Sequence, residues 1–259
     1  MNQTKNGLWN SPLLRSQVTS EDVRPPEMLF GYLIGPFGAL LASGIFTSQL
    51  QNYLTNVLKL DLGFLTTLQL LSTILIVAAN LVVGQLIERT RTLAGKARPW
   101  ILLSALTLSV ASVLMFIVPF ADRTARMVWI AIAYNAYYAV GFPIYNTANS
   151  TLVPVSTRNS KQRSTLASLT NIASLGVMGV GSMIFPTLVS MALKEDQHLW
   201  FVAMLGVAIF TALTILLQFR FTRERVTEES AGAEKAEKSN ASLGEQVKAV
   251  TSEKSWWLA

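Results

Sequence analysis

The chain has 259 residues, of which 51% are hydrophobic and 14% are charged, with a net charge of +6. This composition excludes an ordinary soluble domain and predicts an all-α membrane protein with several spans. The excess of cations does not predict nucleic-acid binding, because the basic residues collect in short segments between apolar runs. The absence of cysteine excludes disulfides, thiolate metal sites and a cysteine nucleophile.

Residues 1–26 are polar and contain no apolar core of a signal peptide, so they predict a cytosolic N-terminal arm. Residues 27–222 predict a bundle of six transmembrane helices, because apolar runs long enough to cross a bilayer alternate with short polar segments. The predicted spans cover about 28–58, 64–87, 100–120, 127–152, 164–193 and 199–219.

The first span contains Gly35-Pro36 and Gly38, which interrupt the helical hydrogen bonding. The freed backbone groups must then be satisfied by neighbouring helices or by a wet cavity. The short link around Asp61 joins this span to the second one and is predicted to lie outside the cell.

The segment Gly84–Pro99, which we call the signature segment, holds four cations and one carboxylate between two apolar runs. This charge pattern predicts a cytosolic hairpin by the positive-inside rule. Gly84 is expected to allow the close approach of a neighbouring helix, and Glu88 is expected to pair with an arginine across the hairpin. Pro99 suits the first turn of the following helix.

The fourth span contains Gly141-Phe-Pro143, three helices after the Gly/Pro interruption in the first span. Interruptions at corresponding positions of two three-helix units are typical of inverted repeats in transporters, so we expect a 3+3 inverted repeat with a central binding site. The outer turn between the third and fourth spans carries Arg123 and Arg126, which weaken the charge asymmetry without reversing it.

Three arginines follow the sixth span and predict a cytosolic anchor, so both termini are expected in the cytosol. Residues 223–251 predict a cytosolic central loop with a short amphipathic helix that starts at the capping box Ser242 to Glu245. Residues 252–259 resemble the start of a truncated seventh span. The chain is therefore interpreted as one half of a transporter with about twelve spans, either a truncated product or a fragment.

The signature segment resembles the sequence between helices two and three of the glycoside-pentoside-hexuronide:cation symporters, a melibiose-permease-like branch of the major facilitator superfamily. The matching residues are Gly84, Glu88, Arg89, Thr90, Gly95, Lys96, Arg98 and Pro99. Glu88 stands where the family usually has Asp, and a weaker match covers Thr151 to Pro154 with Arg163. The resemblance implies the N-terminal half of a plasma-membrane sugar or glycoside transporter that works by alternating access, with these residues as a cytoplasmic gating signature.

Amides, hydroxyls and tyrosines are the polar groups that the spans offer to a solute. Several of them recur at helical spacing on one face of a span, which favours a polar cavity. The alternative is that they bond one helix to another. The candidate cavity residues are Asn52, Gln69, Thr73, Asn80, Asn135, Tyr138, Asn146, Asn149 and Asn171.

In the resembled family, a cation site depends on acidic residues in the second span and a sugar site on acidic residues in the first and fourth. Alignment on the quoted motifs places neutral side chains at all of these positions: Ile76, Asn80, Leu40 and Asn146. Because a neutral amide cannot titrate and binds Na⁺ weakly by itself, coupling of the family type is not expected from this half. The expected mode of transport is therefore facilitated diffusion, or cation coupling through the second half.

We therefore expect no enzyme activity, no cofactor and no metal site. The expected partners are a small sugar-like solute, the lipid bilayer and a C-terminal six-helix half from the same or another chain. The alternative is a transport-inactive membrane anchor, or an accessory half that pairs with another subunit.

Overall fold

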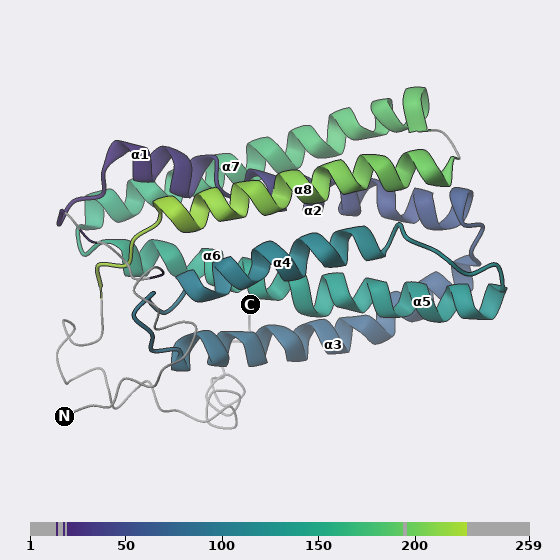
Figure 1. Ribbon diagram of the computed structural model, residues 1–259, viewed down its shortest axis with the longest axis horizontal. Helices are drawn as coiled ribbons and strands as arrows, with labels where there is room; N and C mark the ends of the chain where they lie inside the picture. The colour runs from purple at the N-terminus through teal and green to yellow at the C-terminus, as the bar shows by residue number, and fades with distance from the viewer. Residues whose placement is uncertain (1–13, 15–17, 19, 194–195, 227–259) are drawn as a thin grey trace, which may run out of the picture. The chain divides into compact units, whose positions relative to one another are not determined.

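The computed structural model describes residues 14, 18, 20–193 and 196–226, and in these ranges it is helical without strands. The predicted amphipathic helix after Ser242 and the predicted seventh span lie outside the described residues. The helices, four of them wider π-type segments labelled η, are α1 (Pro25–Glu27), η3 (Met28–Leu33), α2 (Phe37–Asn52), η4 (Tyr53–Val57), α3 (Leu62–Arg89), α4 (Arg98–Leu114), α5 (Arg123–Asn135), η5 (Ala136–Gly141), α6 (Phe142–Ser156), α7 (Ser160–Leu188), η6 (Val189–Leu193) and α8 (Gln197–Phe221) (Figure 1).

Five helical stretches in the described chain are long and apolar enough to cross a membrane: 25–57, 62–89, 123–156, 160–193 and 197–221. The remaining apolar helix, α4, has 17 residues and extends for about 26 Å, slightly less than the usual hydrocarbon thickness. The prediction of an all-α membrane protein is thus confirmed. The count of six crossings depends on α4 and stays a prediction.

Aspartate side chains cap three of the helices at one end of the bundle, which we call the far end. Asp61 accepts a hydrogen bond from the backbone N–H of Phe64 (3.2 Å) at the start of α3. Asp122 does the same for Ala125 (2.9 Å) at the start of α5. Asp196 begins α8 and accepts from His198 (2.8 Å). These carboxylates satisfy N–H groups that have no partner inside the helix, so their local role is structural.

The interruption in the first stretch packs against α8 instead of opening to a cavity. The backbone N–H of Gly38 donates to the Thr214 hydroxyl (3.2 Å), and the Thr211 hydroxyl donates to the Gly38 carbonyl (3.0 Å). A Cβ on Gly38 would lie 2.3 Å from that Thr214 oxygen. The freed backbone groups of this break are therefore satisfied by a neighbouring helix.

The interruption predicted at Gly141-Phe-Pro143, in the stretch 123–156, is not a break, because α5 continues through η5 into α6. Gly141 is required for another reason: a Cβ there would lie 3.0 Å from the Cα of Leu108 on α4. Both Gly/Pro sites thus serve helix packing within the described chain, and the expected inverted repeat with a central binding site stays a prediction.

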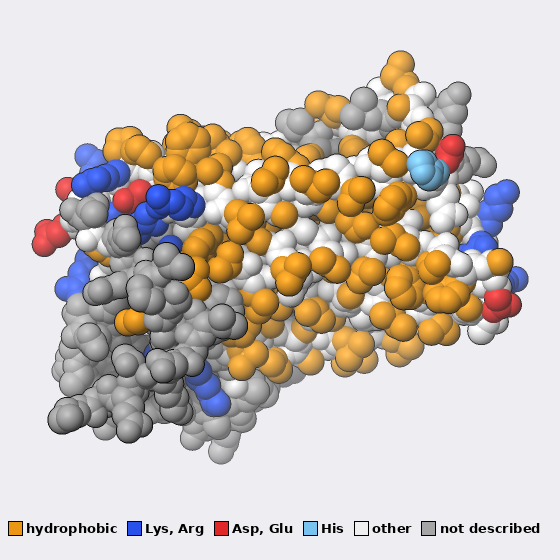
Figure 2. Space-filling view, in the orientation of Figure 1, with side chains coloured by type: hydrophobic (Ala, Val, Ile, Leu, Met, Phe, Trp, Pro, Cys, Tyr) orange, Lys and Arg blue, Asp and Glu red, His pale blue; other side chains and the backbone are white. Residues whose placement is uncertain are grey.

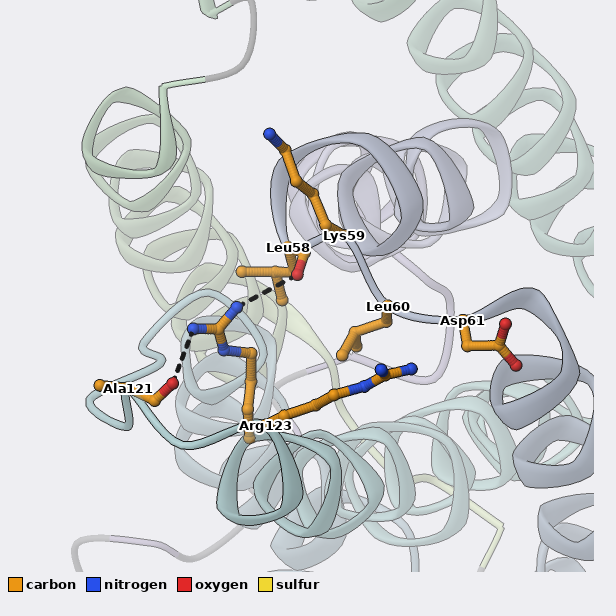
Figure 3. Close-up of a pocket in the computed structure, with 7 residues that line it drawn as sticks. Leu58, Lys59, Leu60, Asp61, Ala121 and Arg123 are labelled. Carbon is orange, nitrogen blue, oxygen red and sulfur yellow. Dashed lines mark hydrogen bonds between the residues drawn. The ribbon is translucent and has the colours of Figure 1, made fainter.

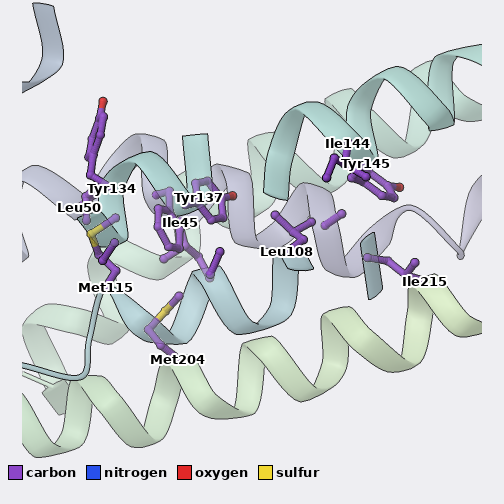
Figure 4. Packing of buried hydrophobic residues seen from close by; sticks show 14 of the residues in the cluster. Ile45, Leu50, Leu108, Met115, Tyr134, Tyr137, Ile144, Tyr145, Met204 and Ile215 are labelled. Carbon is purple, nitrogen blue, oxygen red and sulfur yellow. The ribbon is translucent and has the colours of Figure 1, made fainter. Parts of the chain in front are cut away.

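An aromatic core joins α2, η5 and α8 to the turn that follows α4. Phe46 stacks on Tyr137 at 3.9 Å between ring centroids, and it meets Phe116 edge-on at 5.8 Å. The ring of Trp200, which is fully buried, lies parallel to that of Phe116 at 6.0 Å between centroids. Aliphatic side chains such as Ile45 and the Met204 thioether extend this core (Figure 4).

The face shown in Figure 2 carries apolar side chains along the middle of the helices, while the charged side chains gather at the two ends. Of the long helical stretches, those of α3 and α7 are the most exposed. In the 18-residue apolar segment taken from each, only 17% (62–89) and 8% (160–193) is buried. Such a surface requires lipid or further protein around it.

Candidate functional site

The signature segment forms the turn between α3 and α4 at the end of the bundle opposite the far end, which we call the signature end. Pro99 occupies the first turn of α4, as its residue type predicts. The Thr90 hydroxyl donates to the Leu86 carbonyl (2.6 Å) and accepts from the Trp100 indole N–H (2.8 Å). The end of α3 is thereby tied to the start of α4.

The acid that caps α4 is Glu224, which follows α8 and was not identified from the sequence. Its Oε2 accepts from the backbone N–H of Lys96 (2.6 Å), and its Oε1 accepts from those of Ala97 (2.9 Å) and Arg98 (2.8 Å). Glu224 is 5% exposed, so these bonds are shielded from water. A carboxylate on three N–H groups at a helix N-terminus also interacts favourably with the helix dipole.

Gly95 makes room for this contact. Its φ of +112° is a backbone conformation that residues with a side chain rarely adopt. A Cβ there would also lie 2.4 Å from the Glu224 carboxyl group. Glycine at this position of the signature is therefore explained by the turn and by the approach of Glu224.

Arg98 is buried at the same place and joins α4 to the end of α8. Its guanidinium donates to the carbonyl oxygens of Ala94 (3.0 Å), Phe219 (3.2 Å) and Leu14 (3.3 Å). Its Cζ also lies 4.5 Å from the centroid of the Phe219 ring. This signature arginine is thus an anchor between helices, with planar stacking and several donors that a lysine could not reproduce.

Arg225 connects the end of α8 to two other parts of the chain. Its Nη2 donates to both carboxylate oxygens of Glu27 (2.8 and 2.9 Å), and its Nε donates to the Ser20 carbonyl (2.9 Å). Its backbone N–H donates to the carbonyl of Val155 near the end of α6 (3.0 Å). The part of the N-terminal arm around Ser20 is therefore attached to the bundle. Burial lowers the pKa of the neighbouring Arg223, and the charge of Glu27 opposes that shift.

The other signature residues either lack the contact that the sequence predicted or have exposed or half-buried side chains. No atom of the described chain lies within 4 Å of a Cβ placed on Gly84, so the close approach expected there is not seen. Glu88 and Arg89 are exposed, and Lys96 is half-buried. The sequence offered one indication of the missed residues, the Arg-Glu-Arg run at 223–225 directly after the last span.

The candidate cavity residues on α3 face outward. Gln69, Thr73 and Asn80 are all exposed. The Thr73 hydroxyl donates to the carbonyl of Gln69 (2.8 Å), and the Asn80 amide donates to that of Ile76 (2.7 Å) on its own helix. Since these bonds stay within α3, they join it to no other helix.

In the stretch 123–156 the candidates separate into buried and exposed ones. Asn149 is 8% exposed, and its Oδ1 accepts from the Gln218 amide of α8 (2.7 Å), which is a contact between helices. Asn135 donates to the Ala131 carbonyl (2.9 Å), and half-buried Tyr138 packs against Tyr134 at 4.5 Å. Asn146 is exposed.

Two further candidates lie on α2 and α7. Half-buried Asn52 bonds to Gln49 (3.3 Å) and Asn56 (2.5 Å), which are neighbours along the same helical stretch. Asn171 on α7 is exposed. Because α6 packs against both α3 and α7, the exposed amides that remain belong to three adjoining helices.

These features define a multi-pass membrane protein whose bundle is closed by charged contacts at one end and exposes amides along its apolar length. Among the described residues, no group of three or more His, Cys, Asp or Glu side chains could hold a metal ion.

The family described as MFS/sugar transport protein matches residues 31–259, so the chain belongs to that family. The chain is 26% identical over 218 residues to the isoprimeverose transporter of Lactiplantibacillus pentosus, and the aligned region covers 82% of this chain and 44% of that protein. It is 28% identical over 177 residues to a putative glycoside/cation symporter, YagG, of Escherichia coli strain K12, with 68% and 38% covered. The inner membrane symporter YicJ of the same strain is 27% identical over 177 residues, with 67% and 38% covered.

The resemblance to the glycoside-pentoside-hexuronide:cation symporters is thus confirmed. These relatives are named as transporters and symporters, which is a non-enzymatic class. The chain spans less than half the length of the relatives it matches.

Proposed function

We propose that the chain forms the N-terminal half of a plasma-membrane transporter for a sugar or glycoside. Six helices cross the membrane as a 3+3 repeat, with both termini and the signature end in the cytosol. The half moves solute by alternating access together with a C-terminal half. The observation that carries this proposal is the set of exposed amides on three adjoining helices, α3, α6 and α7.

One exposed amide on each of these helices lies at a similar height in the bundle: Asn80, Asn146 and Asn171. Asn80 precedes the end of α3 by nine residues, Asn146 precedes the end of α6 by ten, and Asn171 follows the start of α7 by eleven. All three distances are measured from the signature end. At 1.5 Å per residue the amides lie about 14 to 17 Å from it, which is near the middle of a bilayer core.

An amide that faces hydrocarbon at this depth leaves hydrogen-bonding groups unsatisfied, which costs several kcal/mol. Amides there are expected to face water, a solute or another protein surface. Amide groups both donate and accept hydrogen bonds, as the hydroxyls of a sugar do. A water-accessible path with a small polar solute meets both conditions.

The surface of α7 supports packing against a second half. A Cβ added to Gly176 or Gly179 would meet no atom of the described chain within 4 Å, so a partner helix could approach their backbone closely. The neighbouring side chain of Leu175 is 80% exposed. An exposed small-residue face flanked by large apolar side chains fits a helix interface within a membrane.

Energy coupling of the family type is not expected from this half. Leu40, Ile76, Asn80 and Asn146 stand at the positions that the resemblance assigns to carboxylates. We propose facilitated diffusion, or coupling through the second half. Uptake under an imposed Na⁺ or proton gradient tests this, and gradient-driven accumulation that disappears in Asn80→Ala would contradict it.

Cysteine labelling in the full-length transporter tests the amide-lined path, because this chain has no cysteine of its own. Asn80→Cys, Asn146→Cys and Asn171→Cys should react with a small polar maleimide. Asn149→Cys is the matched control, since Asn149 lies one turn from Asn146 but is buried against Gln218. Equal labelling of Asn146→Cys and Asn149→Cys, or inert cysteines at all three exposed positions, would contradict the proposal.

Transport itself is tested by sugar uptake into proteoliposomes that contain both halves. Uptake that is reduced by Asn146→Leu but not by Gln69→Leu, nearer the other end of the bundle, is the expected result. A correctly folded protein that takes up no sugar would favour the anchor or accessory role instead.

A further inference from the structure

The N-terminal arm runs across the signature end, where α1 leads into η3 and η3 packs against both α7 and α8 (Figure 1). The carbonyl of Leu14 accepts from the guanidinium of Arg98 in α4 (3.3 Å). Residues 20–23, which we call the strap, follow along the chain and contact two further helix ends. The strap contains no helix, so its position depends on these contacts.

Gln162, near the start of α7, is the residue on which the strap is fastened. Its Nε2 donates to the carboxylate of Asp22 (2.8 Å), and its Oε1 accepts from the backbone N–H of Val23 (3.2 Å). The same Oε1 also accepts from the Thr157 hydroxyl at the end of α6 (3.1 Å). Both polar ends of this amide are therefore used to hold the strap to α7.

Arg225 fastens the same strap to the end of α8. Its Nε donates to the carbonyl of Ser20, as described above, and its Nη2 donates to the carbonyl of Asp22 (3.3 Å). Asp22 is thus bonded to α7 through its side chain and to the end of α8 through its backbone. Because α7 packs mainly against α2 and α8 mainly against α4, the strap adds a direct connection between the two helices.

The contacts of the strap are of a kind that can be broken and remade. Asp22 is exposed and Gln162 is half-buried, so water competes for their polar groups. The chain directly after these contacts is fixed more firmly, because the side chains of Val23 and Glu27 are only 4% and 8% exposed. The strap can therefore leave Gln162 and return to it without unfolding of the bundle.

The far end of the bundle is closed in a different way. There the turn from η4 to α3 and the turn from α4 to α5 meet directly, beside a cavity of about 330 Å³ (Figure 3). The Arg126 guanidinium joins them by donating to the carbonyls of Leu58 (3.2 Å) and Ala121 (3.3 Å). The connection between α7 and α8 at the signature end instead passes through a separate segment of chain.

We propose that the strap is a latch that holds the start of α7 to the end of α8 while the solute path is closed at the signature end, and that it releases Gln162 when the path opens there. The proposal rests on the proposed function, because it names the regulation of that path. Among the long helices α7 is the least buried by its own bundle, and it carries Asn171 of the proposed path. A displacement of its start changes the width of the path at this end.

The latch is tested first by locking it, which the cysteine-free chain allows. Asp22→Cys/Gln162→Cys places one thiol on each side of the 2.8 Å contact, and oxidation with copper phenanthroline joins them. We expect sugar uptake by the full-length transporter to fall about tenfold or more on oxidation and to recover with dithiothreitol, because a locked strap prevents the opening step. Each single-cysteine variant, oxidised in the same way, is the control. Unchanged uptake by the locked pair, or a pair that does not cross-link, would overturn the proposal.

The second test measures the latch without transport. Spin labels on Lys161→Cys and Arg220→Cys, which are exposed residues near the start of α7 and the end of α8, report the distance between the two helices. Asp22→Ala should increase the population at longer distance about tenfold, because it removes a charge-assisted bond to Gln162. Glu21→Ala, which removes the neighbouring exposed carboxylate, is the matched control and should keep the native distribution.

Equal distance distributions for Asp22→Ala and the native protein would overturn the latch, as would an equal change in Glu21→Ala. A native protein that takes up no sugar would contradict the proposed function alone, and the distance measurement then decides on the latch.

Discussion

Replacement of Glu224 is the sharpest test of how the bundle is closed at the signature end. Glu224→Ala leaves the backbone N–H groups of Lys96, Ala97 and Arg98 without the acceptor that the native side chain provides. Loss of a helix cap costs about 0.5 to 2 kcal/mol, and a buried donor without a partner costs about 1 to 3 kcal/mol. Because water can reach some of these groups after truncation, we expect a loss of about 3 kcal/mol in the free energy of unfolding.

Glu224→Gln should cost less than the alanine variant. The remaining carbonyl oxygen can accept from Ala97 and Arg98, which share Oε1 in the native protein. The amide NH₂ would then face the Lys96 N–H, donor against donor. We expect a loss of about 1.5 kcal/mol from this variant, since a single charge-assisted bond is lost.

Gly95→Ala provides a coupled variant at the same place. The added methyl group would overlap the Glu224 carboxyl group, in addition to the strain of the positive φ. In the Glu224→Ala background the overlap disappears and the backbone strain remains. Gly95→Ala should therefore cost less in that background, with a non-additivity of about 1 kcal/mol.

The assay is SDS-induced unfolding in mixed micelles, followed by far-UV circular dichroism. The control is Glu88→Ala, which removes an exposed carboxylate from the last turn of α3 and should change stability by less than about 0.5 kcal/mol. A loss of about 3 kcal/mol corresponds to roughly two orders of magnitude in the unfolding equilibrium. If Glu224→Ala costs no more than Glu88→Ala, the cap is not a stabilising contact and the reasoning fails.

Two further predictions concern contacts of α8. Gly38→Ala should destabilise the bundle by about 2 kcal/mol or more, because the added methyl group would overlap Thr214. Gly206→Ala, whose Cβ would face open space, should be neutral or slightly stabilising. SDS unfolding of both variants measures the difference. Gln218→Met and Asn149→Leu should each cost about 1 to 3 kcal/mol, because each leaves the other amide buried without its partner. The double variant should cost less than the sum, and strict additivity in the same assay would contradict the pairing.

The sequence predicted the features that depend on local pattern. Long apolar runs predicted a helical membrane protein, and the basic hairpin predicted the turn between α3 and α4. Pro99 predicted the first turn of α4. Each of these depends on residues close together in the chain, where hydrophobic length and backbone preferences act directly.

Contacts between distant residues could not be predicted in the same way. Glu224 and Lys96 are 128 residues apart, and Arg225 and Glu27 are 198 apart, so no spacing rule joins them. Helical periodicity placed Asn146 and Asn149 close to one face, but it could not tell that α8 would cover Asn149. The Gly/Pro pattern indicated points where helix packing is unusually close. Whether such a point faces a neighbouring helix or a cavity depends on the tertiary arrangement, which the local sequence does not specify.

The positions of the carboxylates bear on the proposal that this chain provides no coupling site. The described acids with a clear structural partner cap helices or pair with Arg225, and they all lie at the ends of the bundle: Asp61, Asp122, Asp196, Glu224 and Glu27. A carboxylate that neutralises a helix terminus or an arginine cannot also titrate or bind a cation at mid-membrane without releasing that partner. In the proposed membrane placement, the polar groups near mid-bilayer include amides such as Asn80, which keep their charge state across the physiological pH range. This division, with acids at the ends and amides between them, supports the proposal that this chain contributes to solute binding without coupling it to a cation.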